Sequence, residues 1–134
     1  MSIKYQDAED ISLRISDIAK TLDMKHIDFS RVHAFRSHGS GSRGTVARCH
    51  ALSKIWQKAL KTQAVYLIEV ISERFDKMSK QEQDKVLIHE LMHIPISFGG
   101  GFKHHDYVCD RNVGILHKEF LKRKNEKQSF QNWF

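Results

Sequence analysis

Apolar side chains recur at helical spacing in two segments of the chain. Residues 7–22 carry acidic side chains at their front and an apolar stripe behind them. The stripe consists of Ile11, Ile15, Ile18, Ala19 and Leu22. Residues 79–94 carry a second stripe, made of Leu87, Leu91 and Ile94 and widened by Val86, Ile88 and Met92. The two patterns predict an amphipathic helix that ends near Asp23 and a later helix that is mostly buried.

Start and stop signals support the later helix. Ser79-x-x-Glu82 has the form of a capping box, in which each side chain satisfies a free backbone N–H of the other residue. The helix is expected to stop at Pro95. The glycines at 99–101 then accept the backbone angles that let the chain fold back over the helix.

Alternating and β-branched positions predict strands. Residues 31–36 alternate polar and apolar side chains, and we expect residues 46–51 to pair with them across a glycine-containing loop at 38–44. Residues 65–71 form the clearest strand of the chain. Their place just before the later helix suits either a sheet edge that pairs with an extended peptide or an ordinary central strand.

Two further helices are predicted. Residues 52–60 form a short helix with Ile55, Trp56 and Ala59 facing inward. Residues 106–123 form a final helix whose apolar side chains, Val108, Val113, Leu116 and Phe120, pack against the core. Residues 128–134 are expected to be a docked aromatic tail or a frayed end. A chain of 134 residues, of which 40% are hydrophobic, supports one modest core, so we expect a single α+β domain spanning residues 1–134.

The later helix also carries the candidate chemistry. His89-Glu90-Leu91-Met92-His93 places two imidazoles four residues apart, where they share one helix face and can close on a single Zn²⁺. Glu90 stands one step round the helix, in the position of a general base. A carboxylate and two imidazoles are costly to bury unless a metal ion compensates for the lost hydration. The pattern therefore predicts a zinc metallopeptidase.

The third ligand must come from the chain that returns after the glycines. A catalytic zinc site has three protein ligands and one open position. His104 and His105 both lie within reach of the helix, and Asp106 and Cys109 are lower-ranked alternatives. The residues alone leave the choice between the two histidines open.

These residues also resemble a known family. The segments HELMHIP (89–95) and FGGGF (98–102), with His105 and the Tyr107-Val108 pair, resemble the phage-type metallopeptidases, small HExxH zincins of phages, archaea and their viruses. The resemblance extends less closely over residues 31–60 and 65–75. It implies a minimal zincin-like fold, with a small mixed or antiparallel sheet, an active-site helix and packed N- and C-terminal helices. It also implies that zinc is bound by His89, His93 and His105 and that Glu90 is the general base. The His104-His105 doublet departs from the family pattern and leaves room for a slip of one position.

Peptide hydrolysis usually uses further polar groups beside the metal. Tyr107 and His104 are the nearest candidates for a second electrophile, and we predict Tyr107 as a catalytic residue beside Glu90. Asp106 or Asp110 can accept the second N–H of a ligating imidazole. Each has an ordinary structural explanation too, because a Tyr can be a packed aromatic and acids favour helix N-termini.

Charge and cysteine content indicate which partners and which cellular compartment to expect. Lys and Arg number 22 against 16 Asp and Glu, a net charge of +6 that is partly concentrated near the C-terminus. This charge is compatible with nucleic-acid binding, but no recognition motif indicates it, and a peptide or protein substrate is the expected partner. Cys49 and Cys109 lack paired metal-site spacing and are expected to be free thiols. Without an apolar signal core or membrane span, the chain is expected to be cytoplasmic, with no membrane association.

Two rival functions fit the same residues. In the first, the metal is structural and supports a nucleic-acid- or partner-binding module, held by His89, His93, His105 and Cys109. Glu90 argues against it, because a closed structural site has no use for a carboxylate beside the metal. In the second, a zincin-like fold binds a regulatory or viral partner with little turnover. Hydrolysis of another amide or of an ester is also compatible with the site.

Overall fold

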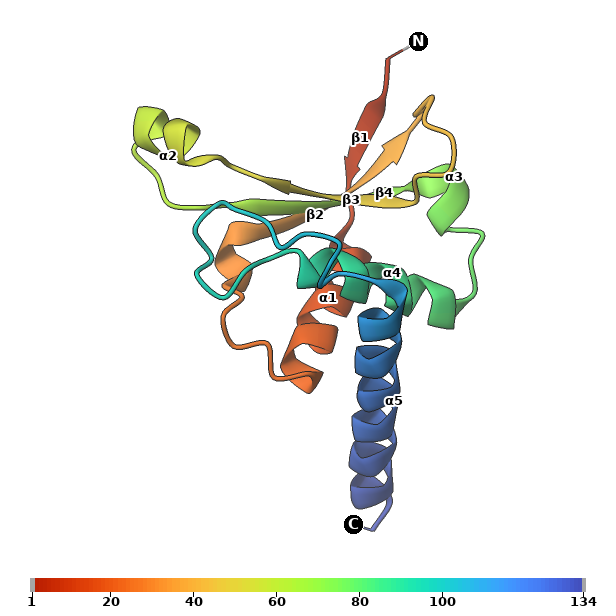
Figure 1. Cartoon of the computed structure of the whole chain (residues 1–134). Helices are drawn as coiled ribbons and strands as arrows, with labels where there is room; N and C mark the ends of the chain where they lie inside the picture. The colour runs from red at the N-terminus through yellow and green to blue at the C-terminus, as the bar shows by residue number, and fades with distance from the viewer. Residues whose placement is uncertain (1, 134) are drawn as a thin grey trace.

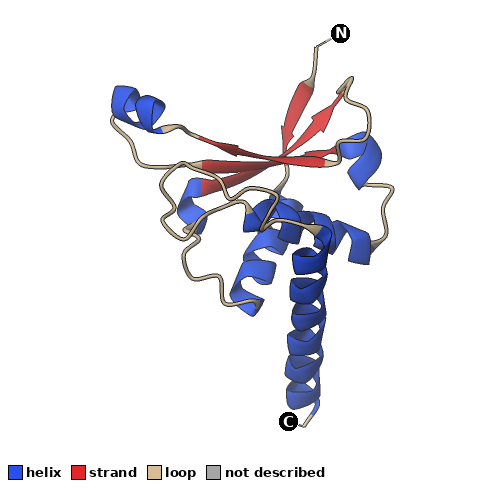
Figure 2. Cartoon of the chain, in the orientation of Figure 1, coloured by secondary structure: helices blue, strands red, loops and turns tan. Residues whose placement is uncertain are grey.

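The computed structural model describes residues 2–133 and consists of a sheet with helices gathered mainly beneath one of its faces (Figures 1 and 2). In chain order the elements are β1 (Lys4–Asp7), α1 (Glu9–Thr21), the 3₁₀ helix η1 (Phe29–Arg31), β2 (Val32–His38), β3 (Ala47–Ala51), α2 (Lys54–Leu60), β4 (Tyr66–Ile71), α3 (Ser72–Phe75), α4 (Lys80–Met92) and α5 (Asp110–Asn132). The mixed four-stranded sheet with five α-helices confirms the prediction of a small zincin-like α+β fold.

The strands lie in the order β1-β2-β4-β3. β4 runs parallel to β2 and antiparallel to β3, whereas β1 pairs antiparallel with the other side of β2. The prediction that residues 46–51 pair with residues 31–36 is therefore wrong, because β4 lies between them. Nearly every side chain of β4 is buried, and such a strand is most stable with both of its edges paired. Of the two alternatives for residues 65–71, the structure therefore shows the central strand. β3 lies at an edge of the sheet.

The helical stripes predicted from the sequence form the core beneath the sheet. The apolar faces of α1 and α4 are almost fully buried, including Ile11, Ile15, Ile18, Leu87 and Leu91. α4 starts as predicted, because the hydroxyl of Ser79 accepts a hydrogen bond from the backbone N–H of Glu82 at 3.2 Å. This burial fixes the orientation of α4 and hence of the side chains at its C-terminal end.

The final helix differs from the prediction at both ends. α5 begins at Asp110 because the carbonyl of His104 accepts backbone N–H groups from Tyr107 and Val108, which forms a turn in place of a first helical turn. At the other end, residues 128–132, predicted to be a docked aromatic tail or a frayed end, continue the helix. The helix leaves the body of the protein and carries its last residues into solvent (Figure 1). Phe134 lies outside the described residues.

The short helix α2 is exposed where the sequence predicted burial. Ile55 and Trp56 are 77% and 58% exposed, and Ala59 is exposed as well. Gln57 is the one side chain of α2 that is even half-buried. α2 lies beyond the end of β3, where the layer of α1, α4 and α5 does not reach (Figure 1). The prediction of an inward apolar face is therefore wrong.

α5 is long, but it is too polar to cross a bilayer, and within residues 2–133 no other helix is both long and apolar enough to do so.

Candidate metal centre

The C-terminal end of α4 brings one nitrogen of each of two imidazoles together. The Nε2 atoms of His89 and His93 lie 3.3 Å apart. Two nitrogens bound to one tetrahedral zinc at about 2.0–2.1 Å would be about 3.3–3.4 Å apart. The spacing therefore fits a shared metal ion without any change in the helix.

His105 completes a group of three possible donors. One nitrogen from each of His89, His93 and His105 lies within 4.8 Å of the other two. Among the described residues this is the one such group of His, Cys, Asp or Glu side chains, so neither Asp106 nor Cys109 joins it. His104 lines the adjoining cleft but does not join it either. Three nitrogens with no fourth protein donor leave a position open, which is the donor set of a catalytic site.

The loop that carries His105 is held by the sheet and by α2. The hydroxyl of Tyr66 on β4 donates to the carbonyl of Gly101 at 2.8 Å and accepts from the N–H of Gly100 at 2.9 Å. The side-chain amide of Gln57 donates to the carbonyl of Gly99 at 3.0 Å. These contacts fix the path of the glycine loop, and with it the return of His105 toward α4.

His93 is oriented by a backbone group. Its Nδ1 lies 2.7 Å from the carbonyl oxygen of Lys103, and because a carbonyl can only accept, Nδ1 carries the proton. Nε2 is then the unprotonated nitrogen, and it faces His89. Sequence reasoning assigned this orienting role to an acidic side chain and missed the carbonyl, because a backbone acceptor leaves no signal in residue type.

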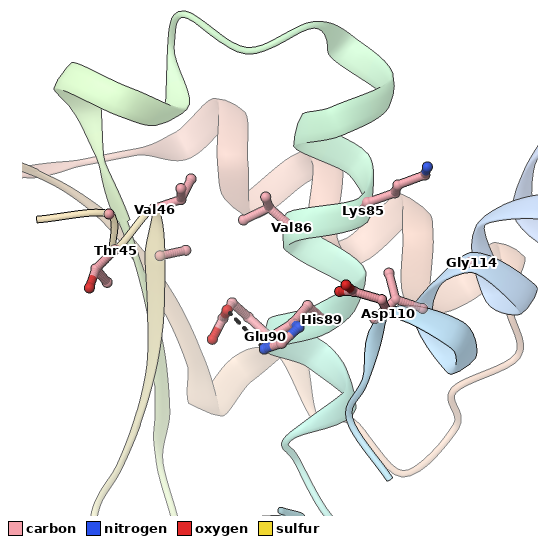
Figure 3. A pocket seen from close by; sticks show the side chains of 11 residues that line it. Thr45, Val46, Lys85, Val86, His89, Glu90, Asp110 and Gly114 are labelled. Atoms are coloured by element: carbon pink, nitrogen blue, oxygen red, sulfur yellow. Dashed lines mark ion pairs between the residues drawn. The ribbon is translucent and has the colours of Figure 1, made fainter. Parts of the chain in front are cut away.

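The electrostatics of His89 favour the form that binds metal. Burial lowers the pKa of His89, and the neighbouring His93 and His105 lower it further, while Asp110 acts in the opposite direction. The ring is consequently neutral near pH 7, with a lone pair available for a cation. Asp110, at the start of α5, lies beside His89 in the cleft (Figure 3), which is where one of the two predicted acids was expected to act.

Glu90 is a buried carboxyl next to the three imidazoles. Its Oε2 lies 3.9 Å from His89 Nε2, the pair joined by the dashed line in Figure 3. Burial raises the pKa of Glu90 to about 7, although a hydrogen bond from the backbone N–H of Cys49 partly offsets the effect. A carboxyl with a pKa near neutrality can both take up and release a proton at physiological pH.

Two hollows meet at His89 and Glu90. One, of about 690 Å³, lies between β3, α4 and the start of α5, and its wall includes Val46, Val86 and Val113 (Figure 3). The other, of about 430 Å³, runs along β3 toward Phe102. Each is large enough for several atoms of a bound chain, so the candidate metal centre lies at the middle of a continuous cleft.

The free edge of β3 borders this cleft. Val46 and Leu52 flank β3, and both make backbone hydrogen bonds to residues 65–71. Because antiparallel pairing alternates, the odd-numbered residues of β3 turn their N–H and C=O groups away from β4. These residues are Ala47, Cys49 and Ala51. The hydrogen bond from the Cys49 N–H to Glu90 shows that this edge faces the buried carboxyl of Glu90.

Tyr107 does not enter the cleft. It lines a separate cavity, where its ring lies under the ammonium group of Lys103 at 4.2 Å. Asp106 accepts a hydrogen bond from the N–H of Tyr107 at 2.9 Å and so stabilises its own turn. The catalytic role predicted for Tyr107 stays a prediction, and the geometry gives it no support.

Gly100 offers a test of the loop that carries His105. Its φ is +103°, and a Cβ atom there would clash with the amide of Gln57 and lie 2.7 Å from the carbonyl oxygen of Leu52. We expect Gly100→Ala to lower the free energy of unfolding by about 1–3 kcal/mol, as measured by urea denaturation. Gly101→Ala is the matched control, because its added methyl would meet no atom within 4 Å. Equal unfolding midpoints for the two variants would contradict the assignment.

Comparison with known proteins gives one match. A family model described as "Putative phage metallopeptidase" matches residues 3–124, which include all of the cleft-lining residues named above. No curated protein and no solved structure matches the chain.

Proposed function

The chain belongs to the phage metallopeptidase family, and from this premise we propose that it is a zinc-dependent metallopeptidase in which His89, His93 and His105 hold the metal and Glu90 is the general base. The observation that carries the proposal is the group of three imidazole nitrogens within 4.8 Å of one another beside a buried carboxyl. Imidazole donors favour zinc over magnesium or calcium, which prefer oxygen ligands.

Zinc bound there would supply Lewis-acid activation of a water molecule and of the scissile carbonyl. Glu90 would accept a proton from the water as its oxygen adds to the carbonyl carbon. It would then deliver that proton to the amine nitrogen as the C–N bond breaks, which leaves a free acid and a free amine. A pKa of about 7 suits both transfers, because neither protonation state is strongly disfavoured.

The chain's own groups would position the substrate. An extended peptide can add to the edge of β3 through the outward N–H and C=O groups of Ala47 and Ala51 and the outward C=O of Cys49. A peptide paired with this edge would lie next to the buried carboxyl of Glu90, because the Cys49 N–H on the same edge donates a hydrogen bond to Glu90. An apolar side chain of the peptide fits the hollow walled by Val46, Val86 and Val113. The carbonyl of Lys103 would keep His93 directed at the metal throughout.

Metal removal and restoration test the proposal. Cleavage of dye-labelled casein should be lost after chelation and return with one equivalent of Zn²⁺, whereas Mg²⁺ should not restore it, because three imidazoles suit the softer ion. Metal content by mass spectrometry and the rate of dye release are the two measurements. Full cleavage by the metal-free protein, or no cleavage by a folded protein that carries one zinc, would exclude a zinc peptidase.

A further inference from the structure

α2 presents an apolar stripe that the fold itself does not use. Ile55, Trp56 and Leu60 are 77%, 58% and 59% exposed, and with Ala59 they lie on neighbouring positions of two helical turns. The helix is attached to the rest of the protein through Gln57, whose amide donates to Leu52 and Gly99 carbonyls. Clustered apolar side chains of this size that do not support the core are typical of a binding surface.

A cationic stripe lies beside the apolar one. Lys54, Lys58 and Lys61 follow at i, i+4 and i+7, and within residues 2–133 none of the three forms an ion pair. The surrounding sequence has no neutralising acid, since residues 29–68 contain seven Lys or Arg and no Asp or Glu. In the remainder of the chain the 15 cations are balanced by 16 acids, whereas the cations of this segment have no acid beside them in the sequence. We refer to Ile55, Trp56, Leu60 and the three lysines as the α2 surface.

The α2 surface continues the cleft. β3 borders the candidate metal centre, and Leu52 and Ser53 alone separate β3 from α2. The amide of Gln57 also contacts the glycine loop, which leads directly to Phe102 in the wall of the same cleft. Figure 1 shows α2 at the end of the β3–β4 pair, displaced from the helical layer. A polypeptide that lies along the edge of β3 and extends beyond Ala51 therefore arrives at α2.

We infer that the α2 surface binds an acidic segment with interspersed apolar side chains in the substrate polypeptide, outside the residues that surround the scissile bond. This inference rests on the proposed function, since it takes the substrate to lie along β3. The unpaired lysines select carboxylates, and the stripe of Ile55, Trp56 and Leu60 takes the apolar side chains between them. Continuity with the cleft favours a polypeptide over a membrane, because a bilayer cannot follow the strand edge into the site.

Peptide binding to the α2 surface can be measured in the absence of peptide cleavage. Four fluorescein-labelled peptides share one uncharged core and carry a tail of Asp and Leu, Gln and Leu, Lys and Leu, or Asp and Gln. Fluorescence anisotropy with the full chain, in the presence of a chelator so that the peptides stay intact, gives the Kd of each. We expect the Asp–Leu tail to bind about tenfold more tightly than the other three, with weaker discrimination at high salt.

Variants of α2 assign the preference to this surface. Trp56→Ala with Leu60→Ala should remove most of the advantage of the Asp–Leu tail. Replacement of Lys54, Lys58 and Lys61 with Glu should make the peptide with the Lys–Leu tail the tightest binder of the four. Matched controls on α5 are Ile115→Ala, which truncates a side chain that is 56% exposed, and the reversal of the exposed Lys118, Lys122 and Lys127 to Glu. The control variants should bind like the wild type.

The outcomes separate this inference from the proposed function. Equal Kd values for the four tails, or equal losses in the α2 and α5 variants, would overturn the inference. An Asp–Gln tail that binds as well as the Asp–Leu tail would also overturn it, because the surface would then attract any polyanion. Trp56-dependent sedimentation with phosphatidylserine vesicles, together with no tail preference, would assign the surface to membranes instead. If the zinc-loaded protein does not cleave labelled casein, the peptidase proposal fails, while the binding result still decides the role of α2.

Discussion

Glu90→Gln is expected to lower kcat/KM for peptide cleavage by about 10²–10⁴-fold while the protein keeps its zinc. Gln has the shape of the carboxyl but cannot accept a proton from water. Its amide is neutral, as the carboxyl itself is for much of the time when burial raises the pKa of Glu90 to about 7. The substitution should therefore not disturb packing at the end of α4, and the expected loss belongs to proton transfer.

The measurement pairs initial cleavage rates with zinc content and thermal unfolding for both proteins. Equal zinc content and an unfolding temperature no lower than that of the wild type would isolate the chemical step. Near-normal cleavage by a zinc-loaded Glu90→Gln protein would remove the general base from the proposal.

His105→Ala should weaken zinc binding by more than about 100-fold, because substitution of the groups that merely orient metal ligands already costs about 10–100-fold. The remaining pair, His89 and His93, could still bind zinc weakly through the two Nε2 atoms that face each other. Competition with a chromophoric chelator gives the affinity directly and needs no substrate.

His104→Ala is the matched control for this prediction. The two histidines are adjacent and both exposed, yet only His105 belongs to the group of three nitrogens. We expect His104→Ala to bind zinc with wild-type affinity. The reverse result, in which His104→Ala loses the metal and His105→Ala keeps it, would show the one-position slip that the sequence alone leaves open.

The helices could be predicted from the sequence because their periodicity coincides with burial. The apolar stripes of α1 and α4 are buried as expected, and the hydroxyl of Ser79 caps α4. Strand pairing was predicted incorrectly, since the alternation within residues 46–51 does not identify the neighbouring strand. The inward face assigned to α2 was wrong for a related reason. An apolar stripe shows that a surface will be covered, but not that the same chain covers it.

Part of the candidate site could also be predicted from the sequence, and part could not. Helix geometry alone brings His89 and His93 together, so that pair could be predicted from spacing. The placement of His105 depends on the path of the glycine loop, which is set by hydrogen bonds from Tyr66 and Gln57. Those partners are distant in sequence from the loop, and no local pattern connects them. The tyrosine at the start of this mostly aliphatic strand was the available signal, because a buried phenol needs a hydrogen-bond partner.

The two hydrogen bonds of Tyr66 have a consequence for the order in which the protein matures. A nascent chain that has formed α4 already has two neighbouring imidazoles, His89 and His93, that can bind a metal ion together. The placement of the proposed third donor, His105, depends on the central position of β4, because the Tyr66 hydroxyl on that strand holds the glycine loop. On the proposed function, tight metal binding and peptide cleavage would therefore both require a complete sheet.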